Sequence, residues 1–190
     1  MASDLCEGGA QVIQIRAKDL PESGAFRIAE AVKPVTDNAS VALVINDYPN
    51  VAREVGADAV HLGQEDFFEG GYHHANQVRG EPAQVRVGLS THGPEQAARA
   101  LAAGPDYIAI GPVFATPTKP GRPAVTLDYV RWAAANVTIP WFAIGGITLE
   151  NLDDVLAAGA TRICVVSAIL NAENTAKACR EFAKRLGSRP

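Results

Sequence analysis

Residues 141–166 read WFAIGGITLENLDDVLAAGATRICVV, which is an apolar run, a helix-like pattern and a second apolar run. In the middle part, apolar residues recur three and four positions apart, the spacing of one face of a helix. Thr148 is expected to cap the N-terminus of a helix over residues 149–158, and Gly159 to follow its C-terminus. The flanking runs are short and are typical of buried strands. The stretch therefore predicts a strand–helix–strand unit.

The same alternation repeats along the whole chain. Seven runs are predicted to be strands: residues 11–16, 41–46, 58–62, 85–89, 107–110, 141–144 and 162–166. Helical patterns lie between them, for example the one that begins at Pro94, a favoured first helical residue. Strands and helices that alternate at such short, even spacing predict an α/β fold. We expect a (β/α)8 TIM barrel of parallel strands, built as one domain over residues 1–190.

A closed barrel of this kind needs eight strands, and the sequence supplies seven. Residues 1–10 read as the tail of a helix, with no room for a strand before it. The first strand is therefore predicted to be missing, so that the domain is short at its N-terminus. The strands at 11–16 and 162–166 would then have unpaired edges, which proteins usually avoid. Either the chain is shortened or a neighbouring chain fills the gap; both readings stay open, as does a homo-oligomer.

Composition narrows the partners and the compartment. The 190-residue chain has a net charge of −4 and no cluster of Lys and Arg, which argues against a nucleic-acid or membrane partner. Three cysteines without metal-ligand spacing favour a reduced, cytoplasmic setting, and the first residues carry no apolar signal segment. We expect small-molecule ligands, bound by local charges.

The first predicted strand ends in three polar residues of alternating spacing. Gln14, Arg16 and Lys18 recur at period two, so an extended backbone places them on one face. Near the mouth of a barrel they would form an anion clamp, in which Arg16 binds phosphate oxygens with two hydrogen bonds. The alternative is that Arg16 and Lys18 simply extend into solvent at a strand end.

Acidic residues follow the next two predicted strands. Asn46 and Asp47 end one strand, and Asp66 comes shortly after the next. Since the carboxyl ends of adjacent parallel strands share one rim, the two aspartates are expected to lie side by side. A pair of oxygen ligands beside a phosphate clamp suits Mg²⁺, which leans on substrate phosphates. Each aspartate taken alone would more often cap its following helix.

Later strand ends carry hydroxyls, glycines and one lysine. The loop after residues 107–110 brings Thr116, Thr118 and Lys119 together, and its prolines exclude a helix. This loop suits phosphate or pyrophosphate, and an ordinary surface loop is an equal alternative. Ser90 follows another strand; no general base accompanies it in the sequence, and His61 reads as a core histidine.

Two glycines precede a predicted helix near the end of the chain. Gly145 and Gly146 would let backbone amides approach a phosphate closely, and Ser167 follows the next strand. Turn geometry alone would also explain a glycine pair. Together, the candidate residues describe one site for pyrophosphate with Mg²⁺ and a second for a monophosphate.

Six segments together resemble the thiamin-phosphate synthase family. They are residues 14–18 (QIRAK), 45–47 (IND), 56–66 (GADAVHLGQED), 88–92 (GLSTH), 111–119 (GPVFATPTK) and 143–147 (AIGGI). The resemblance implies a (β/α)8 barrel that joins 4-amino-2-methyl-5-hydroxymethylpyrimidine diphosphate to a thiazole monophosphate and releases pyrophosphate. It also implies a dissociative step, in which pyrophosphate leaves before the thiazole nitrogen attacks.

The resemblance also implies roles for single residues. The pyrimidine and pyrophosphate contacts fall on a polar set, of which Arg16, Ser90 and Lys119 are expected to be catalytic: Gln14, Arg16, Lys18, Asn46, Ser90 and Lys119. The Mg²⁺ ligands fall on Asp47 and Asp66. Contacts to the thiazole phosphate fall on a second set: Thr116, Thr118, Gly146, Val166 and Ser167.

Two alternatives stay beside this interpretation. One is the sister group of thiazole tautomerases, which typically has a histidine at the position of Pro112 and lacks the Thr-x-Thr-Lys segment and the second aspartate. The other is a truncated barrel that binds thiazole phosphate without turnover. The synthase is favoured over the tautomerase by Pro112, Thr116, Thr118, Lys119 and Asp66. Retention of the charged residues argues against the binding protein, whereas the missing strand argues for it.

Overall fold

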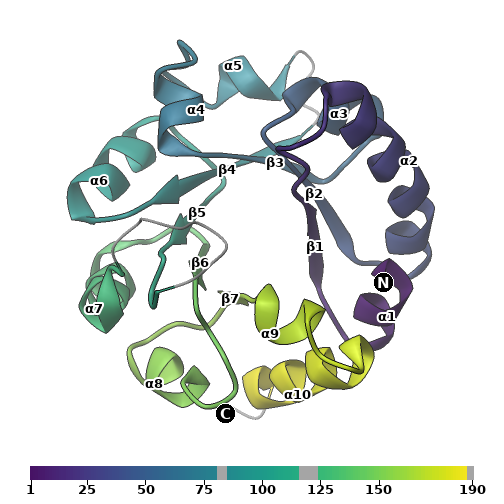
Figure 1. The fold of residues 1–190 in the computed structure, drawn as a ribbon. Coiled ribbons are helices and arrows are strands. Elements are labelled where there is room, and N and C mark those ends of the chain that lie inside the picture. Colours follow the sequence, from purple (N-terminus) through teal and green to yellow (C-terminus); the bar gives the residue numbers. More distant parts are fainter. Residues whose placement is uncertain (81–84, 116–123, 188–190) are drawn as a thin grey trace.

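The computed structural model describes residues 1–80, 85–115 and 124–187. Its centre is one sheet of seven parallel strands in the order β1 to β7, with helices on the outside (Figure 1). The strands are β1 (Val12–Ile15), β2 (Ala42–Asn46), β3 (Ala59–Leu62), β4 (Arg86–Thr91), β5 (Tyr107–Ile110), β6 (Trp141–Ile144) and β7 (Ile163–Cys164). Each predicted strand is confirmed, and the parallel, TIM-like α/β architecture is confirmed with them.

Helices follow nearly every strand. They are α1 (Ala2–Glu7), α2 (Glu22–Asn38), α3 (Pro49–Glu54), α4 (Gln64–Phe68), α5 (Asn76–Arg79), α6 (Pro94–Ala102), α7 (Thr126–Asn136), α8 (Leu152–Ala157), α9 (Ser167–Leu170) and α10 (Thr175–Gly187). Helix α6 begins at Pro94, as predicted. Because both faces of the sheet are covered, the middle strands are almost wholly apolar and buried, as in β3 and β5. None of the helices within the described ranges has the length and apolarity that a membrane span requires.

Two predicted boundaries are wrong in instructive ways. Helix α8 begins at Leu152, with Asn151 rather than Thr148 as its N-cap residue. The Asn151 side chain accepts a hydrogen bond from Thr148 N–H (2.9 Å) and donates one to the Gly146 carbonyl oxygen (2.9 Å), so it closes the preceding turn instead. Strand β4 runs on to Thr91, so Ser90 lies inside the strand rather than after it.

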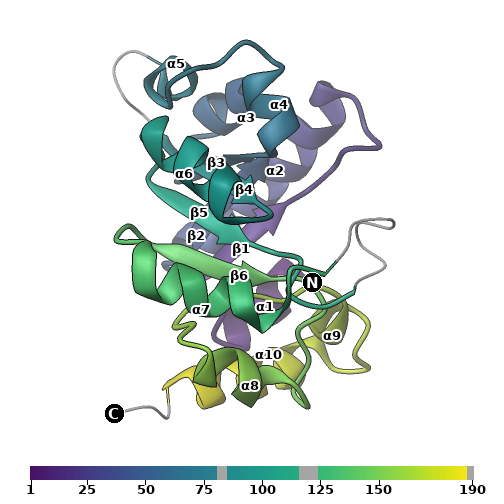
Figure 2. The same cartoon turned by 90° about the vertical axis from the view of Figure 1, so that its left-hand side faces the viewer.

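Between β1 and β7 the sheet is open in the part of the chain that the structure describes, whereas the surrounding layer of helices is continuous. Within the described residues, β1 pairs only with β2 and β7 only with β6, and no eighth strand is present there. The helix layer is continuous at this place, because α1 packs against both α10 and α2 (Figures 1 and 2). An eight-stranded closure therefore stays a prediction.

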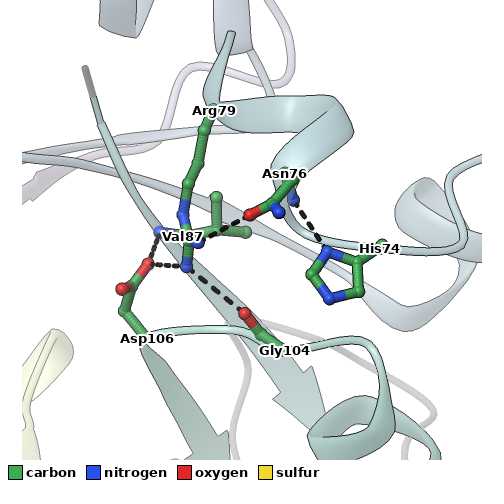
Figure 3. Close-up of polar contacts among 6 residues, drawn as sticks. All are labelled: His74, Asn76, Arg79, Val87, Gly104 and Asp106. Atoms are coloured by element: carbon green, nitrogen blue, oxygen red, sulfur yellow. Dashed lines mark hydrogen bonds and ion pairs between the residues drawn. The ribbon is translucent and has the colours of Figure 1, made fainter. Parts of the chain in front are cut away.

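A polar cluster ties β4 and β5 together where these strands begin (Figure 3). Asp106 Oδ2 accepts hydrogen bonds from Val87 N–H (2.7 Å) and from Arg79 Nη2 (2.6 Å). The same guanidinium donates to Asn76 Oδ1 (2.8 Å) and to the Gly104 carbonyl oxygen (3.3 Å). We call Arg79 and Asp106 with these partners the amino-end cluster. It lies at the end of the strands opposite to the predicted site, so we expect it to serve stability.

Candidate active site at the carboxyl ends of the strands

One lysine and two aspartates meet beyond the ends of the first three strands. Lys18 Nζ lies 3.1 Å from Asp47 Oδ2 and 3.0 Å from Asp66 Oδ2. Asp47 directly follows β2, and Asp66 lies in the first turn of α4. A Cβ at Gly63 would lie 2.7 Å from Asp66 Oδ2, so the glycine leaves room for this carboxylate. The three residues, here the acidic cluster, come together as predicted, with Lys18 between the two carboxylates.

The Asp47 carboxylate is buried without well-formed hydrogen bonds from the described residues, and its backbone is strained. Both carboxylate oxygens are buried, and within the described residues neither accepts a hydrogen bond of good geometry, although Lys18 is in ion-pair range. Burial raises the pKa of Asp47 above its ordinary value, and the nearby Lys18 charge opposes this shift. The backbone has φ 71°, in the left-handed region that few non-glycine residues adopt. Such strain at a polar residue is characteristic of functional sites.

Lys18 is stabilised as a cation between the carboxylates. Burial lowers the pKa of Lys18, but its hydrogen bond to Asp66 and its attraction to the charges of Asp47 and Asp66 outweigh burial and leave the pKa raised. The ammonium group therefore stays charged at neutral pH. A charged Lys18 is available to an anionic ligand and also neutralises part of the aspartate charge.

The acidic cluster fits a hard divalent cation. A buried carboxylate with acceptor oxygens lacking donors, beside a second carboxylate, offers the oxygen ligands that Mg²⁺ prefers. No group of three or more His, Cys, Asp or Glu side chains gathers for a metal anywhere in the described ranges. Mg²⁺ is commonly held by one or two carboxylates together with substrate phosphates and water, so two aspartates suffice.

Of the three residues predicted to form the anion clamp, Gln14 lies in β1, whereas Arg16 and Lys18 follow the end of that strand. Gln14, Arg16 and Lys18 are exposed, whereas Ile13 between them is buried and Ile15 is half-buried. Arg16 is close enough to Asp47 for its charge to favour the ionised carboxylate. Asn46 ends β2 and is buried next to the acidic cluster. Their binding of the pyrimidine diphosphate stays a prediction.

Ser90 has a partner that sequence reasoning missed. His61 Nε2 lies 2.9 Å from Ser90 Oγ, and the side-chain amide of Gln64 donates to the Ser90 carbonyl oxygen (2.8 Å). No base stands near Ser90 in the sequence, but strand pairing brings β3, and with it His61, beside β4. His61 Nδ1 faces the Tyr107 hydroxyl at 3.2 Å rather than a carboxylate, so the arrangement is not a serine-hydrolase triad. Alternation within β3 did predict His61 as a buried residue, which is confirmed.

A backbone-built region lies beyond β6 and β7. Gly145 and Gly146 have positive φ angles of 102° and 65°. A Cβ at Gly146 would lie 2.7 Å from Phe114 Cβ and 2.8 Å from the Ala115 carbonyl oxygen, so only glycine fits. Val166 precedes α9 as its N-cap residue, and Ser167 is the first residue of that helix. We call these residues the glycine rim; its role in phosphate binding stays a prediction.

The loop after β5 joins this rim through its first residues. Val113 N–H donates to the Ile144 carbonyl oxygen (2.9 Å), and Phe114 N–H to the Gly145 carbonyl oxygen (3.0 Å). Thr116, Thr118 and Lys119 themselves lie outside the described residues, so the predictions for them rest on sequence.

The fold and the site together define a TIM-like α/β protein whose strand ends are suited to anionic ligands. A family model described as thiamine monophosphate synthase matches residues 1–169. The chain therefore belongs to this family, as the sequence segments indicate.

Thiamine-phosphate synthases of several bacteria are similar in sequence to this chain over most of their length. The chain is 47% identical over 186 residues to a thiamine-phosphate synthase of Thermus thermophilus, covering 94% of this chain and 84% of the relative. It is 43% identical to that of Acidothermus cellulolyticus, with coverage of 95% and 84%. The solved structure of thiamine phosphate pyrophosphorylase from Pyrococcus furiosus superposes with a TM-score of 0.85 at 30% identity, over 98% of this chain and 87% of that one.

Proposed function

We propose that this chain is a thiamin-phosphate synthase, a transferase of thiamin biosynthesis. It would join 4-amino-2-methyl-5-hydroxymethylpyrimidine diphosphate to 4-methyl-5-(2-phosphoethyl)thiazole and release pyrophosphate. The observation that carries the proposal is the acidic cluster: a charged Lys18 between Asp47 and Asp66, at the strand ends of a chain that belongs to the family. We expect the enzyme to act in the cytoplasm on these two small molecules.

The charged and polar residues near the carboxyl ends of the strands would hold the diphosphate. Arg16 and Lys18 would bind its oxygens, with Asn46, Ser90 and Lys119 as further donors and Gln14 on the pyrimidine side. Asp47 and Asp66 would hold Mg²⁺, which when bound neutralises charge that grows on the departing pyrophosphate. Lys18 already lies between the two aspartates, so it is placed to move from them onto the phosphate oxygens.

The bond change needs charge stabilisation rather than a nucleophile from the protein. The C–O bond to pyrophosphate breaks first and both electrons leave with the oxygen; the thiazole nitrogen then donates its lone pair to the pyrimidinyl-methyl cation and forms the C–N bond. Fixed donors at the site of growing negative charge lower the barrier to the first step. Alignment of the two bound substrates favours capture of the cation.

The glycine rim would hold the thiazole monophosphate. Gly146 allows close approach of backbone amides, and Val166 and Ser167 lie at the end of the neighbouring strand. Thr116 and Thr118 are proposed to complete the site from the loop after β5. The two anions would then enter the same mouth from opposite sides, each on the rim suited to it.

The test is product formation by the purified chain. With both substrates and Mg²⁺, we expect thiamin phosphate, read by thiochrome fluorescence, and no product when Mg²⁺ is chelated. Asp66→Asn should raise the Mg²⁺ concentration needed for half-maximal rate, because one of two ligands loses its charge. Folded protein that makes no thiamin phosphate but binds the thiazole phosphate would overturn the proposal in favour of a binding protein.

A further inference from the structure

Three side chains form a row across the middle of the sheet. In the strand register, His61 of β3 lies beside Gly88 of β4, and Gly88 lies beside Tyr107 of β5. The His61 and Tyr107 rings stack over the glycine with centroids 5.6 Å apart. Ser90 follows two residues after Gly88, so its side chain points to the same face of β4. The row thus leads from the interior to the mouth.

Gly88 makes this contact feasible. A Cβ at Gly88 would lie only 2.0 Å from Tyr107 Cζ and 2.4 Å from its hydroxyl oxygen. Any other residue here would push the tyrosine away from His61. Glycine destabilises the interior of a buried central strand, but at this position it leaves room for the contact between the Tyr107 and His61 rings.

The acceptors and donors of the row can be assigned. Within the described residues, His61 Nδ1 is the hydrogen-bond partner of the Tyr107 hydroxyl (3.2 Å). Burial raises the pKa of Tyr107, so its hydroxyl keeps its proton. If Tyr107 donates to Nδ1, the ring proton lies on Nε2, which then donates to Ser90 Oγ at 2.9 Å. The Ser90 proton is left over and points elsewhere.

The opposite tautomer would suit the site less well. With the proton on Nδ1, Nε2 would accept from Ser90, whose hydroxyl would then present only lone pairs to a ligand. The Tyr107 proton would also lack a described acceptor. A pyrophosphate oxygen accepts hydrogen bonds and does not donate them, so a serine without a free proton would repel it.

We propose that Tyr107, His61 and Ser90 form a one-way chain of hydrogen-bond donors that fixes the Ser90 hydroxyl as a donor to the leaving pyrophosphate. His61 and Tyr107 are positioning residues: they do not touch the substrate and act through Ser90. Gln64 holds the Ser90 backbone in the same place through its 2.8 Å hydrogen bond. The identity of the anion as pyrophosphate rests on the proposed function. The tautomer of His61 does not depend on it.

The first test reads the tautomer directly in the free protein. A ¹⁵N NMR spectrum of the histidine rings at neutral pH distinguishes a proton on Nε2, on Nδ1 or on both nitrogens. The chain has four histidines, and the signals of His61 are those lost in His61→Gln. We expect the Nε2–H form; an Nδ1–H form or an imidazolium would overturn the proposal.

The second test removes the first donor. Tyr107→Phe keeps the ring and deletes the hydroxyl, so we expect the His61 signals to shift toward a mixture of tautomers. Turnover should fall about three- to tenfold, the equivalent of one hydrogen bond. The KM for the pyrimidine diphosphate should change about twofold or less, since the effect grows with charge in the transition state. Unchanged His61 signals in this variant would contradict the proposal.

A matched control is available beside the row. Tyr129 is also buried and donates through its hydroxyl to Thr91 Oγ1 (2.8 Å), one residue from Ser90. Tyr129→Phe therefore removes a comparable hydroxyl that does not lead to Ser90. It should leave the His61 tautomer as in the wild type. A shift equal to that of Tyr107→Phe would assign the effect to general loosening and overturn the donor chain.

A pair of His61 variants separates donation from filling of space. His61→Gln retains an amide N–H near the position of Nε2, whereas His61→Leu retains only bulk. We expect His61→Leu to lose about ten- to a hundredfold in turnover, and His61→Gln to recover a substantial part of that loss. Equal losses in the two would contradict a donor role.

These outcomes can be told apart from failure of the proposed function. If the wild type makes no thiamin phosphate but shows the Nε2–H form with its dependence on Tyr107, the donor chain stands and the substrate assignment falls. If the wild type is active and His61 carries its proton on Nδ1, the function stands and the donor chain falls.

Discussion

The two ends of the strands each carry an aspartate beside a basic side chain, but the aspartates have very different surroundings. In the amino-end cluster, Asp106 accepts hydrogen bonds from a backbone N–H and from Arg79, and the guanidinium satisfies two further acceptors. In the acidic cluster, Asp47 has a charge partner in Lys18 but no well-formed hydrogen bond, and its backbone is strained. One carboxylate oxygen of Asp106 therefore has two donors, whereas neither oxygen of Asp47 accepts a hydrogen bond of good geometry from the described residues.

This difference between the two aspartates indicates different roles for the amino and carboxyl ends of the strands. A polar group with donors from the protein stabilises the fold, whereas a buried group left without donors costs stability and persists where a ligand supplies the missing partner. In barrels of this type the amino end of the strands serves stability and the carboxyl end serves function. The comparison predicts that stability and activity can be changed separately, one from each end.

Asp47→Asn should have the largest effect on activity. Asparagine fits the same space and tolerates the left-handed backbone, so the fold should be as stable as the wild type or more stable. Turnover should fall about 10²–10³-fold, because a charged ligand beside the pyrophosphate is lost. Urea unfolding and the thiochrome assay measure the two quantities. Asp128→Asn, in an exposed ion pair with Arg131, is the control; lost stability with retained turnover in Asp47→Asn would reverse the comparison.

Gly146→Ala tests the glycine rim and should have the next largest effect. The new methyl group would meet Phe114 and the Ala115 carbonyl at a positive φ, which we expect to cost about 1–3 kcal/mol and to raise the KM for the thiazole phosphate. Gly71→Ala is the matched control: it has φ 84° but no atom within 4 Å of an added Cβ, so it isolates backbone strain. Equal KM values in the two variants would remove Gly146 from the phosphate site.

Arg79→Met should reduce stability and leave activity nearly unchanged. The substitution keeps much of the side-chain bulk but leaves Asp106 with one donor, at a cost of about 1–3 kcal/mol. Arg131→Met breaks a highly exposed pair and should cost well under that. Urea midpoints of both variants, with turnover measured below the transition, are the readout. A large loss of turnover in folded Arg79→Met would show that the two strand ends are coupled, and would contradict their separate roles in stability and activity.

The pH dependence of stability gives the smallest effect. Because the pKa of Asp47 is raised above 3.8 by burial, the folded protein holds this proton more tightly than the unfolded chain. Its contribution to the free energy of unfolding therefore falls as pH rises from the ordinary aspartate value through the raised pKa. Asparagine lacks this ionisation, so the stability advantage of Asp47→Asn should grow across that window and then level off. A difference that is constant with pH would contradict the raised pKa.

The fold was largely predictable because strand periodicity is a local property. The runs at 107–110 and 141–144 match β5 and β6 residue for residue. The start of α8 was not predictable in the same way, since Thr148 and Asn151 are both good caps and the choice depends on how the turn after Gly146 packs.

Proximity of site residues was predictable where adjacent strand ends carry them, whereas their binding roles stay predictions. Lys18, Asp47 and Asp66 could be brought together from the parallel topology alone. His61 could not be connected to Ser90 in this way, because that contact depends on the register of β3 against β4 and on an empty position at Gly88. Alternation within the strand predicted His61 as a core histidine, and its burial is confirmed, but its contact with Ser90 was not predicted.

Calorimetric titration of Mg²⁺ in the presence of saturating pyrophosphate tests most directly whether the unsatisfied carboxylates are kept for a ligand. The wild type and Arg79→Met should bind Mg²⁺ alike, and Asp47→Asn should show little or no binding although it is folded. Equal Mg²⁺ binding by Asp47→Asn and the wild type would contradict the account, because the acidic cluster would then be strained without serving the ligand.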